Sequence, residues 1–123
     1  MTDYLWVCLG AAVGAPSRYV VDRAVQARHD SVMPWGTVLV NVAGSLVLGV
    51  LVGLAVTRDV PESVSLALGV GLCGALTTYS TFSYETLRLV EDGARLQAAL
   101  NVGASLLAGL AAAVLGYALG SAW

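Results

Sequence analysis

Residues 69–83 read GVGLCGALTTYSTFS and lie inside the third of four apolar stretches of this chain. Three glycines precede five Ser and Thr hydroxyls and two aromatic rings. Glycine and β-branched threonine both disfavour a helix interior. We therefore predict a break near 74–78. Irregular backbone at membrane depth is tolerated only where it is buried in protein or lines a cavity, and its freed carbonyl oxygens can coordinate a cation.

The rest of the chain divides into apolar stretches separated by polar segments. Each stretch has roughly the 20 residues that cross a hydrocarbon core of about 30 Å. The sequence predicts an all-α, integral membrane four-helix bundle that forms a single domain over 1–123. The predicted helices cover 4–25, 35–56, 63–84 and 96–122, and the polar breaks cover 26–34, 57–62 and 85–95.

Composition excludes several classes of function. The chain is 58% hydrophobic and 11% charged, against roughly 25% charged residues in soluble domains. It contains no lysine and has a net charge of −2, so nucleic acid is not an expected partner. Cys8, Cys73 and His29 form no metal-ligand pattern, and no catalytic motif is present. We therefore expect no enzyme activity.

Arginines are distributed unevenly between the predicted loops. The first and third loops share one side of the membrane and have Arg18 nearby, whereas the other side has only Arg58. The positive-inside rule then places both termini outside. The arginines in or beside the first and third loops are Arg23, Arg28, Arg88 and Arg95.

Polar side chains within the spans need partners, because an unpaired amide in hydrocarbon costs several kcal/mol. Asn41 shares a helix face with small residues in the second span, and Asn101 and Ser105 do so in the fourth. Helix packing explains such faces. A pore lining is the alternative explanation for the asparagines.

Three segments carry a resemblance to a known family. Residues 71–83 (GLCGALTTYSTFS), 34–45 (PWGTVLVNVAGS) and 10–19 (GAAVGAPSRY) resemble the third, second and first helices of the Fluc/CrcB fluoride channels. The resemblance implies an inverted, dual-topology dimer with two anion pores in the cell membrane. It also implies a central Na⁺ held by the carbonyls of Gly74 and Thr77 of both subunits. The positions that match the family's pore are Asn41, Tyr79, Phe82, Asn101 and Ser105.

Fluoride is strongly hydrated, so a conduit must replace its water with neutral donors that do not trap it. The hydroxyls of Thr78 and Ser80 join Asn41 and Ser105 as candidate donors. Aromatic edges also carry partial positive charge. Arg18 is interpreted as a side chain that reaches for the interface, with an anion-attracting vestibule as the alternative.

Two positions depart from the family pattern. Tyr79 replaces the usual phenylalanine, and Gly109 lies where the polar track of the fourth helix often continues with serine. The resemblance therefore does not supply a hydroxyl at position 109 of that track.

Two other functions compete with fluoride export. A small multidrug proton/cation antiporter would need an acid in the middle of the first span, and none is present. A membrane accessory subunit without transport would explain the glycine faces but not residues 71–83. The arginine bias favours one orientation, so the predicted partner is either a second copy or an oppositely oriented paralogue.

Overall fold

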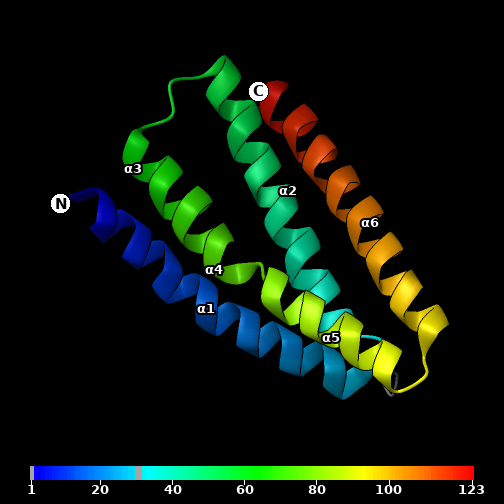
Figure 1. Cartoon of the computed structure of the whole chain (residues 1–123). Coiled ribbons are helices and arrows are strands. Elements are labelled where there is room, and N and C mark those ends of the chain that lie inside the picture. The colour runs from blue at the N-terminus through cyan, green and yellow to red at the C-terminus, as the bar shows by residue number, and fades with distance from the viewer. Residues whose placement is uncertain (1, 30–31) are drawn as a thin grey trace.

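The computed structural model describes residues 2–29 and 32–123, and all regular secondary structure within these ranges is helical (Figure 1). This confirms the all-α prediction. The third predicted helix consists of several segments in sequence. The elements are α1 (Thr2–Arg28), α2 (Trp35–Thr57), α3 (Glu62–Val64), the π-helical η1 (Ser65–Cys73), α4 (Gly74–Leu76), α5 (Tyr79–Glu91) and α6 (Arg95–Ser121).

Three regions are long and apolar enough to cross a membrane: α2, the region Glu62–Glu91, and α6. Helix α1 has 27 residues, as many as α6, but it is not among them. It carries Asp3, Arg18, Asp22 and Arg23 among its apolar side chains. A crossing by α1, which would make four spans, therefore stays a prediction.

The helices pack as two pairs. Helix α2 lies along α6, while α1 lies along η1 and α4 and also contacts α2 (Figure 1). Helix α5 turns away from the axis of η1 and rests against α6. Since η1 and α6 do not contact each other, the two pairs diverge on one side of the bundle.

Small residues allow the close contact between α2 and α6. A Cβ atom on Gly49 would collide with the carbonyl oxygen of Ala113, and one on Gly116 would collide with that of Leu46. The small-residue faces of these two helices therefore bring the backbones together, as is common for helices packed in lipid.

The termini and the described connections lie at the two ends of the molecule. The two termini and the α2–α3 connection lie at one end of the molecule, and the α5–α6 turn lies at the other (Figure 1). That turn contains Gly93, which adopts φ 81°, a conformation that favours glycine. The predicted polar break over 26–34 contains residues 30 and 31, which lie outside the described residues.

The outer surface is rich in apolar side chains. Leu107 and Val114 of α6 are 73% and 68% exposed, and Val13 of α1 is 60% exposed. By contrast, the largest fully buried side chains in the described ranges are Val40 and Asn101. Such an exposed surface suits contact with lipid or with a partner subunit rather than with water.

Candidate functional site

The third helical region is interrupted at Thr77 and Thr78. Both residues adopt extended backbone, with φ −80° and ψ 155° at Thr77 and φ −148° and ψ 124° at Thr78. The interruption lies within the predicted range of 74–78. Thr78 then caps α5, because its Oγ1 accepts a hydrogen bond of 3.1 Å from Thr81 N.

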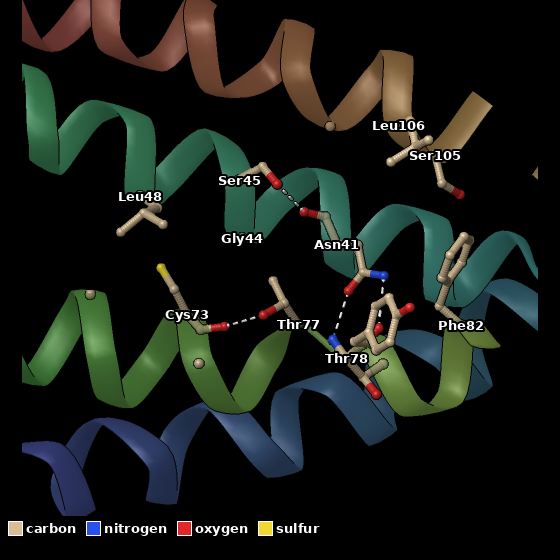
Figure 2. A pocket seen from close by; sticks show the side chains of 14 residues that line it. Asn41, Gly44, Ser45, Leu48, Cys73, Thr77, Thr78, Phe82, Ser105 and Leu106 are labelled. Atoms are coloured by element: carbon tan, nitrogen blue, oxygen red, sulfur yellow. Dashed lines mark hydrogen bonds between the residues drawn. The ribbon is translucent and has the colours of Figure 1, made fainter. Parts of the chain in front are cut away.

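Asn41 of α2 holds the interruption in place. Its Oδ1 accepts from Thr78 N at 2.7 Å, and its Nδ2 donates to Thr78 O at 3.1 Å (Figure 2). The side-chain amide thus replaces the backbone partners that Thr78 would have in a continuous helix. An amide nitrogen carries two protons, so one N–H of Asn41 remains for another acceptor.

The break also leaves carbonyl oxygens without partners. Cys73 O accepts from both Thr77 N, at 3.0 Å, and Thr77 Oγ1, at 2.7 Å. Among the described residues, no hydrogen bond ends on the carbonyl oxygen of Gly74 or Thr77. Gly74 is exposed, and a Cβ atom there would have nothing within 4 Å.

A groove of about 410 Å³ opens beside the break, between α2, the η1–α5 region and α6 (Figure 2). None of the described residues that line it is charged, although amide and hydroxyl groups interrupt its apolar wall. The lining residues are Asn41, Gly44, Ser45, Leu48, Gly69, Cys73, Gly74, Thr77, Thr78, Tyr79, Phe82, Ser105, Leu106 and Gly109.

Two aromatic rings lie at the end of the groove where α5 begins. The ring centroids of Tyr79 and Phe82 are 6.3 Å apart, and the rings are tilted by 47°. Tyr79 is 82% exposed, whereas Phe82 is half-buried. Phe82 and Ser105 of α6 both line the groove (Figure 2), so an aromatic ring and a hydroxyl are presented to the same space.

The structure brings most of the predicted site residues to this groove. Asn41, Thr78, Tyr79, Phe82 and Ser105 line it, as do Gly74 and Thr77. Two predicted pore residues, Ser80 and Asn101, do not line the groove. Ser80 is exposed, with its Oγ 3.4 Å from Thr78 Oγ1, and Asn101 has an exposed fraction of 0%.

Arg18 lies at a second, smaller cavity of about 190 Å³ between α1, α2 and α5. This cavity is also lined by Asp22 and Thr37, and Thr78 lines both the cavity and the groove. Arg18 is half-buried. The cavity fits either interpretation of Arg18 made from the sequence.

Two polar contacts between helices could not be predicted from the sequence alone. Thr37 Oγ1 donates to Glu85 Oε1 at 2.5 Å and so joins α2 to α5. Thr86 Oγ1 accepts from Asn101 Nδ2 at 2.8 Å. The available signal was the position of Thr86 one turn after Phe82, on the amphipathic helix α5.

Comparison with known proteins identifies the family. A family model described as "CrcB-like protein, Camphor Resistance (CrcB)" matches residues 5–117. The chain belongs to the CrcB family. Three membrane-capable helices and this CrcB membership identify a multi-pass membrane protein.

Related proteins carry more specific names. The "Fluoride-specific ion channel FluC 1" of Frankia casuarinae is 59% identical over an alignment of 125 positions, which covers 98% of this chain and 97% of that protein. The protein of the same name from Streptomyces avermitilis is 60% identical, covering 93% of this chain and 92% of its own length. The "Fluoride-specific ion channel FluC" of Shewanella woodyi is 43% identical, with 86% of each chain covered.

Proposed function

We propose that this CrcB protein is a passive, fluoride-selective anion channel of the cell membrane that lets fluoride leave the cytoplasm. The observation that carries the proposal is its identity of 59% and 60% to two proteins named as fluoride-specific ion channels. The groove beside the interrupted helix supplies chemistry suited to this role.

The groove offers neutral donors and no fixed charge. The free N–H of Asn41, the hydroxyls of Ser105 and Thr78, and the ring edges at Tyr79 and Phe82 replace water around a small anion. Ser80 lies next to Thr78 and extends this set of hydroxyls toward the exposed side. Because none of the described lining residues is charged, the anion meets no strong electrostatic trap.

The energetics favour a passive route. Hydrogen fluoride crosses membranes as a neutral acid and dissociates inside the cell. An inside-negative potential then drives the anion outward by about 2.3 kcal/mol per charge per 100 mV. Transport by this route needs no nucleotide or coupling ion.

A second subunit completes the site in this proposal. One chain leaves the groove open, with Gly74 exposed and Tyr79 82% exposed. In an inverted dimer, in which α1 also crosses the membrane, the same surface of the partner would cover both residues. The partner is either a second copy or an oppositely oriented paralogue.

The break has the chemistry of a site for Na⁺. Hard cations prefer oxygen ligands, and the carbonyl oxygens of Gly74 and Thr77 have no hydrogen-bond partner among the described residues. Two subunits would bring four such oxygens together. A bound Na⁺ would supply positive potential beside the groove, while Asn41 holds the backbone at Thr78 in the required conformation.

Arg18 contributes at the entrance in this proposal. Its guanidinium lies at a cavity that shares Thr78 with the groove, so it would raise the local concentration of anions without entering the narrow path.

Reconstitution of this chain alone into liposomes loaded with fluoride tests the function. We expect rapid fluoride release, measured with an ion-selective electrode, and no comparable chloride release in a matched assay. Comparable chloride release would contradict the selectivity. Fluoride release that appears only when a paralogue is present would show an obligate heterodimer, and none under either condition would contradict the channel.

A further inference from the structure

A partly buried series of hydrogen bonds links α6 to the backbone of α5 beside the groove. Ser105 Oγ lies 3.4 Å from Asn101 Oδ1, Asn101 Nδ2 lies 2.8 Å from Thr86 Oγ1, and Thr86 Oγ1 lies 2.8 Å from Phe82 O. Asn101 is fully buried and does not line the groove. Ser105, at one end of this series of hydrogen bonds, lines the groove.

The donor and acceptor of each hydrogen bond in the series are fixed by the last bond, from Thr86 Oγ1 to Phe82 O. A backbone carbonyl can only accept, so the bond to Phe82 O uses the single hydroxyl proton of Thr86. Thr86 Oγ1 can therefore only accept from Asn101, which must present its Nδ2. The amide then turns its Oδ1 toward Ser105, and Ser105 must donate its own proton to Asn101.

We propose that Asn101 and Thr86 are positioning residues that set the availability of the Ser105 hydroxyl to the permeating anion. This inference rests on the proposed function. Asn101 lies behind the pore rather than in it, because it is fully buried and does not line the groove. From there, the Asn101 side-chain carbonyl oxygen competes with fluoride for one proton of Ser105.

The lengths of the bonds suit such a competition. The two bonds to Thr86 Oγ1 are 2.8 Å, within the usual range, whereas the bond from Ser105 to Asn101 is 3.4 Å and therefore weak. Ser105 can rotate its proton toward an anion in the groove at low cost and return it when the anion leaves. The path thus binds fluoride without holding it tightly.

Replacement of Thr86 by valine tests the direction of these hydrogen bonds. Thr86→Val keeps the shape of the side chain but removes the acceptor for Asn101 Nδ2. The Asn101 amide nitrogen then finds an acceptor only if the side-chain amide rotates by 180°. After this rotation Nδ2 donates to Ser105 Oγ, and the Ser105 proton becomes available to an anion in the groove. We expect the half-saturating fluoride concentration in planar bilayers to fall by about three- to tenfold.

Two further variants separate this effect from general damage. Thr86→Ser keeps the hydroxyl and should behave like the wild type. In a Ser105→Ala background, Thr86→Val should have no further effect on half-saturation, because the competing proton is absent. An unchanged or raised half-saturation in Thr86→Val, or a fall that persists in the Ser105→Ala background, would overturn the proposal.

A measurement without transport tests the wild-type protein directly. In solid-state NMR of the chain in bilayers, Asn101 Nδ2 should show a stronger dipolar contact to Thr86 Cβ than to Ser105 Cβ. The reverse order would overturn the hydrogen-bond direction. Absence of fluoride current in the wild type would instead overturn the proposed function, and with it the competition at Ser105, before any variant is compared.

Discussion

Asn41 and Thr78 form two reciprocal hydrogen bonds, in which one side-chain amide satisfies both backbone groups of a residue at the helix break. Aspartate at position 41 would keep an acceptor for Thr78 N but lose the donor to Thr78 O, and would place negative charge in the groove. We expect Asn41→Asp to reduce fluoride flux by more than tenfold. Flux from liposomes measures this effect.

Ser45→Ala is the matched control for that prediction. Ser45 lies one turn further along α2, and its hydroxyl donates to the backbone oxygen of Asn41 at 2.8 Å. Its loss leaves the pair between Asn41 and Thr78 intact, so flux should change far less than in Asn41→Asp. Equal losses in the two variants would argue against a special role for Asn41.

Phe82 presents an aromatic ring to the groove that Ser105 also lines, and we expect Phe82→Ile to abolish most fluoride flux. Isoleucine is apolar but has no electropositive ring edge. Leu106→Ile changes another residue that lines the groove and should retain flux. Both variants should elute at the wild-type position in size-exclusion chromatography, and wild-type flux in Phe82→Ile would remove Phe82 from the anion path.

Gly109 offers a position at which a donor can be added. A Cβ atom there would meet Ser45 Oγ at 3.7 Å, which is ordinary van der Waals contact. Gly109→Ser should therefore fold normally and lower the half-saturating fluoride concentration by about threefold or more, because one hydrogen bond is gained. Gly109→Ala is the control that adds volume without a hydroxyl, and an equal change in both variants would contradict this explanation.

Gly49 and Gly103 should respond oppositely to alanine. A Cβ atom on Gly49 would collide with the backbone of Ala113, whereas one on Gly103 would have nothing within 4 Å. We expect Gly49→Ala to destabilise the protein by about 1–3 kcal/mol and Gly103→Ala to stabilise it by about 0.5–1 kcal/mol. Thermal unfolding in detergent compares them, and equal shifts would refute the close approach of α2 to α6.

Removal of sodium tests the proposed role of the unpaired carbonyl oxygens at Gly74 and Thr77. Replacement of Na⁺ by N-methylglucamine on both sides of the membrane should lower fluoride flux, because that cation is too large for a small oxygen site. Restoring Na⁺ should restore the flux. Flux that is independent of Na⁺ would contradict the proposed role of a cation bound at the break.

Much of the fold follows from local features of the sequence. Apolar stretches of about 20 residues predict helices, and the glycine, threonine and serine content of 69–83 predicts the break that lies at Thr77 and Thr78. Asp92-Gly93 predicts the turn before α6. These features depend on residues that are close together in the sequence, so they can be predicted from composition and spacing.

The roles of the polar residues depended on the tertiary structure. Asn41 and Asn101 have the same side chain in similar surroundings in the sequence, yet Asn41 lines the groove and Asn101 is fully buried. The difference arises because α6 packs against both α2 and α5, which places Thr86 beside Asn101. Sequence alone determined that each amide needs a partner, and only the packing of the helices decided which partner each one has, because hydrogen bonds between helices join residues far apart in the chain.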